Sequence, residues 1–512
     1  MSRAGRSMSA EEFRRHGRAV VEWIARYMEE VERYPVLSQA RPGQVAASLP
    51  AEPPREGEAF ERILADLDRV VMPGITHWQH PGFFAYFPAN ADGASILGDL
   101  VSAGLGVQGM LWATSPACTE VETVMMEWMA SLLALPGRFR AGAGGGAGGG
   151  AGGGAGGGVI QDTASSATLC ALLAARERRT GFRSDAMGMA AAGARLRAYA
   201  SQEAHSSFAK AARIAGLGAD GMVAVACGPD GAMDPAALDA AMRRDAAAGW
   251  VPCMVGATVG TTGCHAMDPL PQVGEVARRH GAWLHVDAAH AGSAAICPEF
   301  RWILDGVELA DSLCINPHKW LGVNFDCDCF WVADRAALVR TLSILPEYLR
   351  NAATESGAVT DYRDWQIPLG RRFRALKLWF VIRHMGAEGL QALVRNHVAL
   401  AQEFRGWVEA DPAWEVAGAS PLSLVCFRHR GGDTVNERIL AHVNASGRAY
   451  LSHARRDGRF TLRLSVGSLA VERRHVEEAW RLLQAAGAAG AAGASGAVDG
   501  HGSTASKSPL RS

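Results

Sequence analysis

Short apolar runs that end at polar residues recur through the middle of the chain. The clearest runs are Leu196–Ser201, Trp283–Val286 and Ser312–Asn316. Runs of this length, bounded by loop residues, are typical of strands that are buried on both faces of a sheet. Segments with helical periodicity, such as residues 167–179, alternate with these runs. The pattern therefore predicts an α/β domain with a doubly wound, mostly parallel sheet.

The N-terminal part of the chain has a helical pattern instead. From Ser9 to about Arg33, apolar residues repeat at helical spacing and form one face. Ser9 and Glu12 fit a capping box at the start of this helix. A second helix is predicted over residues 60–70. Neither helix has enough apolar sequence around it to form a core of its own, so both must pack on another surface.

The C-terminal part predicts a smaller domain of mixed type. A long helix is expected from residue 375 to about 404, followed by alternating strand-like and helical runs. From Gly487 onward the chain is rich in alanine, glycine and serine, lacks apolar residues to bury, and is expected to be disordered. The predicted parts are an N-terminal helical segment (1–92), a large domain (93–376), a small α+β domain (377–486) and a tail (487–512).

Composition and charge exclude several classes of protein. The 512 residues include 51 Lys and Arg against 52 Asp and Glu, and this balance argues against a nucleic-acid partner. The N-terminus has no apolar signal core, and no apolar run is long enough to span a membrane. The ten cysteines are scattered without the spacing of metal ligands, so no metal site is expected. Free thiols without an export signal favour the cytoplasm.

Asp287 and Lys319 stand just after two predicted strands, where ligands bind in open α/β sheets. Pyridoxal phosphate needs such a pair, because a lysine amine bonds to its aldehyde and a carboxylate pairs with its ring nitrogen. The carboxylate favours the protonated nitrogen, which lets the ring accept electrons. Taken singly, Asp287 is equally well a turn or helix cap, and Lys319 a solvated surface lysine. Together they predict a pyridoxal phosphate site.

Three motifs around these two residues carry a resemblance to a known family. HVDAAHAGSA, NPHKW and VNFDC resemble the hallmarks of the pyridoxal-phosphate-dependent group II amino-acid decarboxylases, in the aromatic-L-amino-acid decarboxylase branch. The resemblance extends from about Glu12 to about Leu483. It implies the fold-type-I architecture of aspartate aminotransferase and decarboxylation of dopa, tyrosine, tryptophan, 5-hydroxytryptophan or phenylalanine to the amine. It also implies an obligate homodimer in which the N-terminal segment lies across the partner subunit.

The resemblance assigns further residues to the cofactor. The full set is Thr163, Ala164, Ser165, His205, Thr262, Asp287, Ala289, Asn316, His318 and Lys319. Thr163 and Ser165 precede a predicted helix whose N-terminus suits a phosphate group, and a plain N-cap is the alternative. The resemblance places His205 on the face of the cofactor ring, where it could also transfer protons, and Thr262 beside Asp287.

Two features near the predicted phosphate site are unusual. Asp162 stands where relatives usually have glycine, and its charge would weaken phosphate binding unless it points away. The Gly-rich segment 141–158 contains accidental matches to a phosphate-binding loop. Its simple repeat is instead typical of a flexible linker or an expanded surface loop.

The resemblance also predicts where the substrate binds. The residues concerned are Trp78, Tyr86, Phe87, Pro88, Gln108, Met110 and Gly370. Trp78, Tyr86, Phe87 and Pro88 line a slot for the aromatic ring, as expected for a flat apolar pocket. Gln108 and Met110 close the pocket of the neighbouring subunit. Gly370 stands at a position that varies between glycine and serine among plant relatives. Ala89 replaces a threonine that contacts the substrate carboxylate in animal relatives.

The predicted catalytic residues are Lys319, His205 and Tyr348. Tyr348 belongs to a polar stretch suited to a mobile lid, and the resemblance makes it the proton donor to Cα. A tyrosine there favours amine formation over an aromatic aldehyde synthase, which is the first alternative. A decarboxylase of acidic amino acids is disfavoured because no cationic residue is evident in the pocket. A non-catalytic scaffold is the remote alternative.

Overall fold

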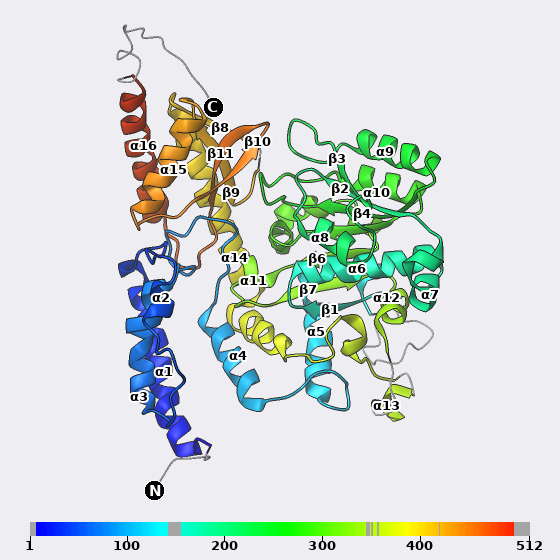
Figure 1. Cartoon of the computed structure of the whole chain (residues 1–512), viewed down its shortest axis with the longest axis horizontal. Helices are drawn as coiled ribbons and strands as arrows, with labels where there is room; N and C mark the ends of the chain where they lie inside the picture. The colour runs from blue at the N-terminus through cyan, green and yellow to red at the C-terminus, as the bar shows by residue number, and fades with distance from the viewer. Residues whose placement is uncertain are drawn as a thin grey trace, which may run out of the picture.

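The computed structural model describes residues 7–141, 155–344, 349, 352–355, 358–418 and 420–495, with side chains to 489. A large α/β body carries a column of elements along one side, formed by the N-terminal helices and by the C-terminal domain (Figure 1). Within the described residues, no helix is long and apolar enough to cross a membrane.

The large body is built on a seven-stranded sheet in the order β1-β7-β6-β5-β4-β2-β3. Its strands are β1 (Gly157–Gln161), β2 (Leu196–Ser201), β3 (Met222–Val225), β4 (Val251–Thr258), β5 (Trp283–Asp287), β6 (Ser312–Ile315) and β7 (Asp328–Val332). Strand β7 is antiparallel to both of its neighbours, and the other pairs are parallel. The predicted α/β fold with a mostly parallel sheet is confirmed.

Helices cover both faces of this sheet and form two apolar cores (Figure 1). One face is covered by α6 (Ala164–Thr180), α8 (Ser207–Ile214) and α12 (Arg335–Leu342); the other is covered by α5 (Pro116–Leu132), α9 (Pro235–Ala247), α10 (Leu270–Arg279) and α14 (Arg374–Ala410). Successive strand residues point to opposite faces. Trp283 therefore belongs to one core and Leu284 to the other, and both are fully buried. This double burial explains why the strand is apolar throughout.

The C-terminal domain contains an antiparallel sheet in the order β10-β11-β9-β8. Its elements are β8 (Trp414–Val416), β9 (Leu424–His429), α15 (Asp433–Ala445), β10 (Ser452–Arg456), β11 (Arg459–Ser465) and α16 (Arg473–Ser495). Helix α14 joins the two domains, because its first half packs in the large core and Phe404 and Val408 pack in the small one. Shorter helices are α2 (Gln44–Ala47), α7 (Arg183–Ala192), α11 (Pro317–Trp320) and α13 (Ala352–Glu355).

The two predicted N-terminal helices lie close to their predicted limits, as α1 (Ala10–Glu30) and α3 (Phe60–Asp66). A further helix, α4 (Gly93–Leu105), follows them and was not predicted. The capping box is present, with Ser9 accepting from the Glu12 backbone and Glu12 accepting from that of Ser9. His16 of α1 stacks on Phe60 of α3, with ring centroids 4.3 Å apart. Most of the remaining apolar face of α1 does not enter a core of this chain.

Three local features differ from what the sequence pattern favours. Asp268 stands directly before Pro269, a position typical of a helix cap, but its carboxylate accepts from the backbone N–H groups of Met233 and Thr258, each at 2.7 Å. Glycines 157 and 158 belong to strand β1, and Trp365 and Trp331 leave no room there for a side chain. Helix α16 continues to Ser495, beyond the expected start of the tail at Gly487, because alanine favours helix.

Candidate active site

All ten residues predicted to bind the cofactor line one cavity of about 200 Å³ at the carboxyl ends of the parallel strands. The cavity is also lined by Phe87, Thr258, Gly260, His290 and Phe325. The folding of β2, β4, β5 and β6 into one sheet explains this grouping, because their loops emerge at the same edge. The structure thus brings together residues that are up to 156 positions apart, from Thr163 to Lys319.

Asp287 is the last residue of β5 and is 5% exposed. Its Oδ1 accepts a hydrogen bond from the backbone N–H of Ala289 at 3.1 Å. The carboxylate is therefore fixed at the cavity wall by its own loop. It is placed to stabilise a positive charge on a ligand in the cavity.

Lys319 lies on the short helix α11, which begins directly after β6 with Pro317 at its first position. Burial lowers the pKa of Lys319, whereas Asp287, Cys314 and Asp328 act in the opposite direction. Burial outweighs these charges, so a larger fraction of Lys319 is neutral than of a lysine in water. A neutral amine is the nucleophilic form that attacks an aldehyde.

Asn316 and His318 flank the lysine on the same turn. The backbone N–H of Cys327 donates to His318 Nδ1 at 2.9 Å, and the Nε2 atom lies 3.2 Å from the Asn316 side-chain amide. Burial lowers the pKa of His318 to about 4. The imidazole is therefore neutral at physiological pH and fixes the position of the loop.

Thr163 occupies the N-cap position of α6, but its side chain makes no capping hydrogen bond. The hydroxyl is therefore free for another partner, and the first N–H groups of a helix have no acceptor within the helix. The Thr163 hydroxyl, these N–H groups and Ser165, which is exposed in this cavity, together form a cradle for an anion, called the anion cradle below. The unusual Asp162 turns back on its own chain, since its Oδ1 accepts from the Thr163 N–H at 2.7 Å.

His205 follows β2 and forms part of the cavity wall. Its Nδ1 accepts from the backbone N–H of Ser207 at 3.2 Å, which leaves the proton of the neutral ring on Nε2. Partial burial lowers the pKa of His205; nearby Asp287 opposes this shift and Lys319 adds to it. At neutral pH the ring is a hydrogen-bond donor through Nε2.

The loop after β4 brings Thr258, Gly260 and Thr262 to the cavity. Gly260 has a φ of +86°, and a Cβ atom there would lie 2.6 Å from that of Ala291. Only glycine fits this close approach. The sequence analysis identified Thr262 but not Thr258 or Gly260. These two residues lie at the end of a buried strand, and the end of a buried strand is also the signal that located Asp287.

Comparison with known proteins identifies the family of this chain. The model of the pyridoxal-dependent decarboxylase conserved domain matches residues 42–430. The chain belongs to this family. Aromatic-L-amino-acid decarboxylase of Rattus norvegicus is 46% identical over 92% of this chain and 97% of the relative. Phenylacetaldehyde synthase of Arabidopsis thaliana is 43% identical over 93% of this chain and 96% of the relative.

A solved structure gives the same result. The Oryza sativa TDC with PLP and tryptamine has a TM-score of 0.89 and 41% identity, covering 94% of this chain and 99% of that one. The family uses pyridoxal phosphate, and the residues of this decarboxylase fit it. The free hydroxyl of Thr163 and the start of α6 suit a phosphate, the carboxylate of Asp287 a protonated ring nitrogen, and the amine of Lys319 an aldehyde.

The residues predicted to bind the substrate are more dispersed in the decarboxylase. Phe87 lines the cavity; Trp78, Tyr86, Pro88, Gln108, Met110 and Gly370 do not. Trp78 and Tyr86 stack with ring centroids 5.8 Å apart and are 38% and 48% exposed. Trp78 also stacks on Phe83 and Tyr86 on Tyr450, whereas Phe87 stacks on His290 in the cavity. Tyr348 lies outside the described residues.

Gln108, Met110 and Gly370 form a separate group. The Oε1 atom of Gln108 accepts from the backbone N–H of Arg371 at 3.0 Å. The backbone carbonyl of Met110 accepts from the backbone N–H of Arg363 at 3.2 Å. That Gln108 and Met110 serve a neighbouring subunit stays a prediction.

A buried ion pair supports this group. The guanidinium of Arg371 donates to both carboxylate oxygens of Glu122, at 2.7 and 3.0 Å, and to the carbonyl of Ile160 at 3.0 Å. Both side chains are 1% exposed. Such bidentate geometry is strong and directional. It ties α5 to the end of β1, immediately before the anion cradle.

A buried cation lies near the pocket, although sequence analysis found none. The guanidinium of Arg463 is 5.5 Å from the ring centroid of Phe87. Its nitrogens donate to the carbonyls of Gly263 and Tyr86 and to the hydroxyl of Ser452. The guanidinium is thus engaged by oxygens of the protein, so its role here is to hold three segments together.

Proposed function

We propose that this decarboxylase converts aromatic L-amino acids to the corresponding amines and CO2. The observation that carries the proposal is the single cavity that joins Lys319, Asp287, His205 and the anion cradle next to the aromatic ring of Phe87. Relatives named for aromatic substrates, at 42–46% identity over more than nine-tenths of the chain, support it.

Bound pyridoxal phosphate supplies a ring that accepts the electron pair left when the bond between Cα and the carboxylate breaks. Thr163, Ala164 and Ser165 would hold the phosphate group. The charge of Asp287 would favour a proton on the ring nitrogen. Ala289, Asn316, His318 and Thr262 would line the rest of the cofactor site.

The remaining side chains orient the substrate and move protons. Lys319, with its pKa lowered by burial, would hold the aldehyde of the cofactor through its neutral amine and would accept a proton when it is not so bonded. His205, whose Nδ1 accepts from Ser207, would donate to the substrate carboxylate through Nε2. Tyr348 gives the proton to Cα. Phe87, with Trp78, Tyr86 and Pro88, excludes water from the ring of the substrate.

Product analysis across a panel of amino acids tests this proposal. The loaded enzyme is expected to release amine and CO2 in equal amounts from at least one of dopa, tyrosine, tryptophan, 5-hydroxytryptophan and phenylalanine, and to leave glutamate unchanged. Arylacetaldehyde with ammonia and hydrogen peroxide would instead favour an aldehyde synthase, which the similarity to phenylacetaldehyde synthase keeps as the second candidate. Release of CO2 from glutamate alone would contradict the aromatic proposal.

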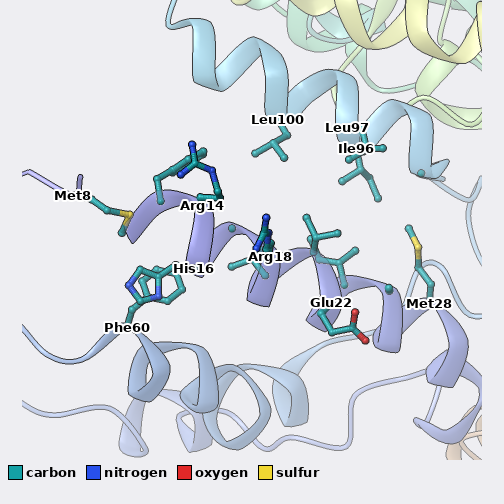
Figure 2. A pocket seen from close by; sticks show the side chains of 17 residues that line it. Met8, Arg14, His16, Arg18, Glu22, Met28, Phe60, Ile96, Leu97 and Leu100 are labelled. Carbon is teal, nitrogen blue, oxygen red and sulfur yellow. The ribbon is translucent and has the colours of Figure 1, made fainter. Parts of the chain in front are cut away.

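We further propose that two chains form an obligate dimer through the N-terminal helices. A groove of about 890 Å³ separates α1 from α4, and most of its lining residues are apolar, with Arg14, His16, Arg18 and Glu22 among them (Figure 2). Phe13, Leu97 and Leu100 are 58%, 47% and 48% exposed there. Apolar surface of this extent favours burial against a partner. A second chain inserting its own α1 and α4 would fill the groove.

The dimer also explains the separate position of Gln108, Met110 and Gly370. In the proposed assembly they approach the substrate slot of the partner subunit. Segment 1–92 then serves dimerisation together with α4, the rest of 93–376 binds the cofactor, and 377–486 supports the active site. The ten unpaired cysteines support a cytoplasmic location for this enzyme.

Charge introduced into the groove is expected to separate the subunits. The double variant Leu97→Asp/Leu100→Asp should elute with the mass of one chain in size-exclusion chromatography with light scattering, and should lose most of its activity because the partner side chains are removed. Met187→Asp is the matched control, since Met187 is 59% exposed on α7, away from the groove (Figure 1). A double variant with the mass of two chains would contradict the proposed interface.

A further inference from the structure

His290 lines the same cavity as Lys319 and Phe87, and none of the steps proposed above uses it. It directly follows Ala289 in the loop after β5, and its side chain is 2% exposed. Its Nε2 atom is buried and has no hydrogen-bond partner among the described residues. A buried polar atom without a partner is costly unless a ligand completes it.

The imidazole of His290 is held rigidly between two aromatic rings. Phe87 stacks on it with centroids 3.9 Å apart and an interplanar angle of 12°, and Trp320 stacks on it at 4.6 Å and 4°. The indole of Trp320 is itself fixed, because its Nε1 donates to His397 at 2.9 Å. The ring therefore cannot turn its unpartnered nitrogen toward another protein group without breaking both stacks.

The other ring nitrogen is already engaged. His290 Nδ1 lies 3.2 Å from Nε2 of His265, whose Nδ1 lies 2.7 Å from the hydroxyl of Ser420. Burial lowers the pKa of His290 well below its usual value, and His265, Lys319 and Arg463 act in the same direction. Burial also lowers the pKa of His265 to about 3. Both rings are therefore neutral, and each carries one proton.

Two neutral rings in a row allow two arrangements of protons. If the Ser420 hydroxyl donates to His265, then His265 donates to His290, and the unpartnered Nε2 of His290 carries a hydrogen. If Ser420 accepts instead, the order reverses and the same nitrogen is an acceptor. A hydroxyl group suits both states, because it can accept or donate. An ammonium group can only donate and a carboxylate can only accept.

We propose that His290 Nε2 binds a hydroxyl group on the aromatic ring of the substrate. This inference rests on the proposed decarboxylation of aromatic amino acids. In the proposed reaction the substrate amine takes the place of Lys319 and the carboxylate meets His205, so the ring substituents are the groups left to reach the wall formed by Phe87 and His290. The enzyme then favours phenolic, catecholic or hydroxyindolic amino acids over phenylalanine and tryptophan.

The test compares binding of two unreactive analogues to the loaded enzyme. The dissociation constants of 3-phenylpropanoate and 3-(4-hydroxyphenyl)propanoate are measured by calorimetry, beside kcat/KM for phenylalanine and tyrosine. The wild type should prefer the hydroxylated member of each pair. His290→Phe keeps a ring between Phe87 and Trp320 but lacks the nitrogen, and should reduce both preferences about tenfold.

Two further variants make the result decisive. His290→Leu removes the same nitrogen with a smaller side chain, so the test does not depend on one variant folding. His442→Phe, at an exposed position of α15, is the matched control. It should leave both ratios as in the wild type: the ratio of the two dissociation constants, and the ratio of kcat/KM for tyrosine to that for phenylalanine. Circular dichroism and cofactor content verify that each protein is folded and loaded.

The outcomes separate this inference from the proposed function. Equal ratios in the wild type and in both His290 variants would overturn the role of His290, even if aromatic amino acids are decarboxylated. A loss of preference in the analogue binding would support it, even if no aromatic amino acid proves to be a substrate. A change in cofactor affinity without a change in either ratio would overturn it, because the nitrogen would then face the cofactor.

Discussion

Replacing Lys319 by alanine is expected to lower kcat/KM for every aromatic substrate by about a thousandfold or more, as removal of a covalent catalytic group does in other enzymes. The physical reason is the position of the amine. Lys319 lies at the carboxyl end of β6, in the same cavity as Asp287, and burial lowers its pKa toward the nucleophilic form. No nearby residue is a substitute, because the next described lysine along the chain, Lys377, pairs with Asp99 outside the cavity.

Single-turnover and steady-state measurements of amine release check this prediction, and the visible spectrum of the bound cofactor provides a second readout. Lys210→Ala is the matched control, since Lys210 is exposed on α8 and should tolerate the change. If Lys319→Ala retained more than about a tenth of the wild-type rate with normal cofactor content, the catalytic assignment of Lys319 would be wrong.

Asp287→Asn is expected to lower kcat by about 10²- to 10³-fold, the cost typical of removing one preorganised charge from an active site. Asparagine keeps the size of the side chain and can still accept from the Ala289 N–H through its oxygen. It loses the negative charge that keeps the ring nitrogen protonated. The effect should therefore appear in kcat, whereas protein stability changes little.

Rapid-quench measurement of CO2 release isolates the chemical step in this variant. Asp457→Asn, at the exposed turn between β10 and β11, controls for the substitution itself. An analogue of the cofactor with a permanently charged, N-methylated ring should restore part of the lost rate. A kcat for Asp287→Asn within about threefold of the wild type would show that the carboxylate does not act on the ring.

The parts of the site that could be predicted share one local signal. Asp287, Lys319 and His205 each follow a short apolar run, and the sheet brings the ends of those runs to one edge. The α/β fold was predictable for the same reason. Both faces of its strands are buried, so Trp283 and Leu284 are apolar although they belong to different cores.

The parts that could not be predicted depend on tertiary contacts. Asp268 precedes a proline and looks like a helix cap, but two backbone N–H groups from other segments hold its carboxylate. The pair of Arg371 and Glu122 joins residues 249 positions apart. His290 sits within a recognisable motif, yet its partners Phe87, His265 and Trp320 come from three other segments of the chain. No local pattern links such residues.

The central claim is that Lys319 holds pyridoxal phosphate in this cavity. The most direct test is to reduce the loaded wild-type enzyme with borohydride and to map the labelled peptide by mass spectrometry. The sequence has four lysines, namely Lys210, Lys319, Lys377 and Lys507, so the labelled site is unambiguous. We predict loss of the visible absorption band and one pyridoxyl group per chain, on Lys319. A label on any other lysine, or no label at all on the loaded enzyme, would contradict the claim.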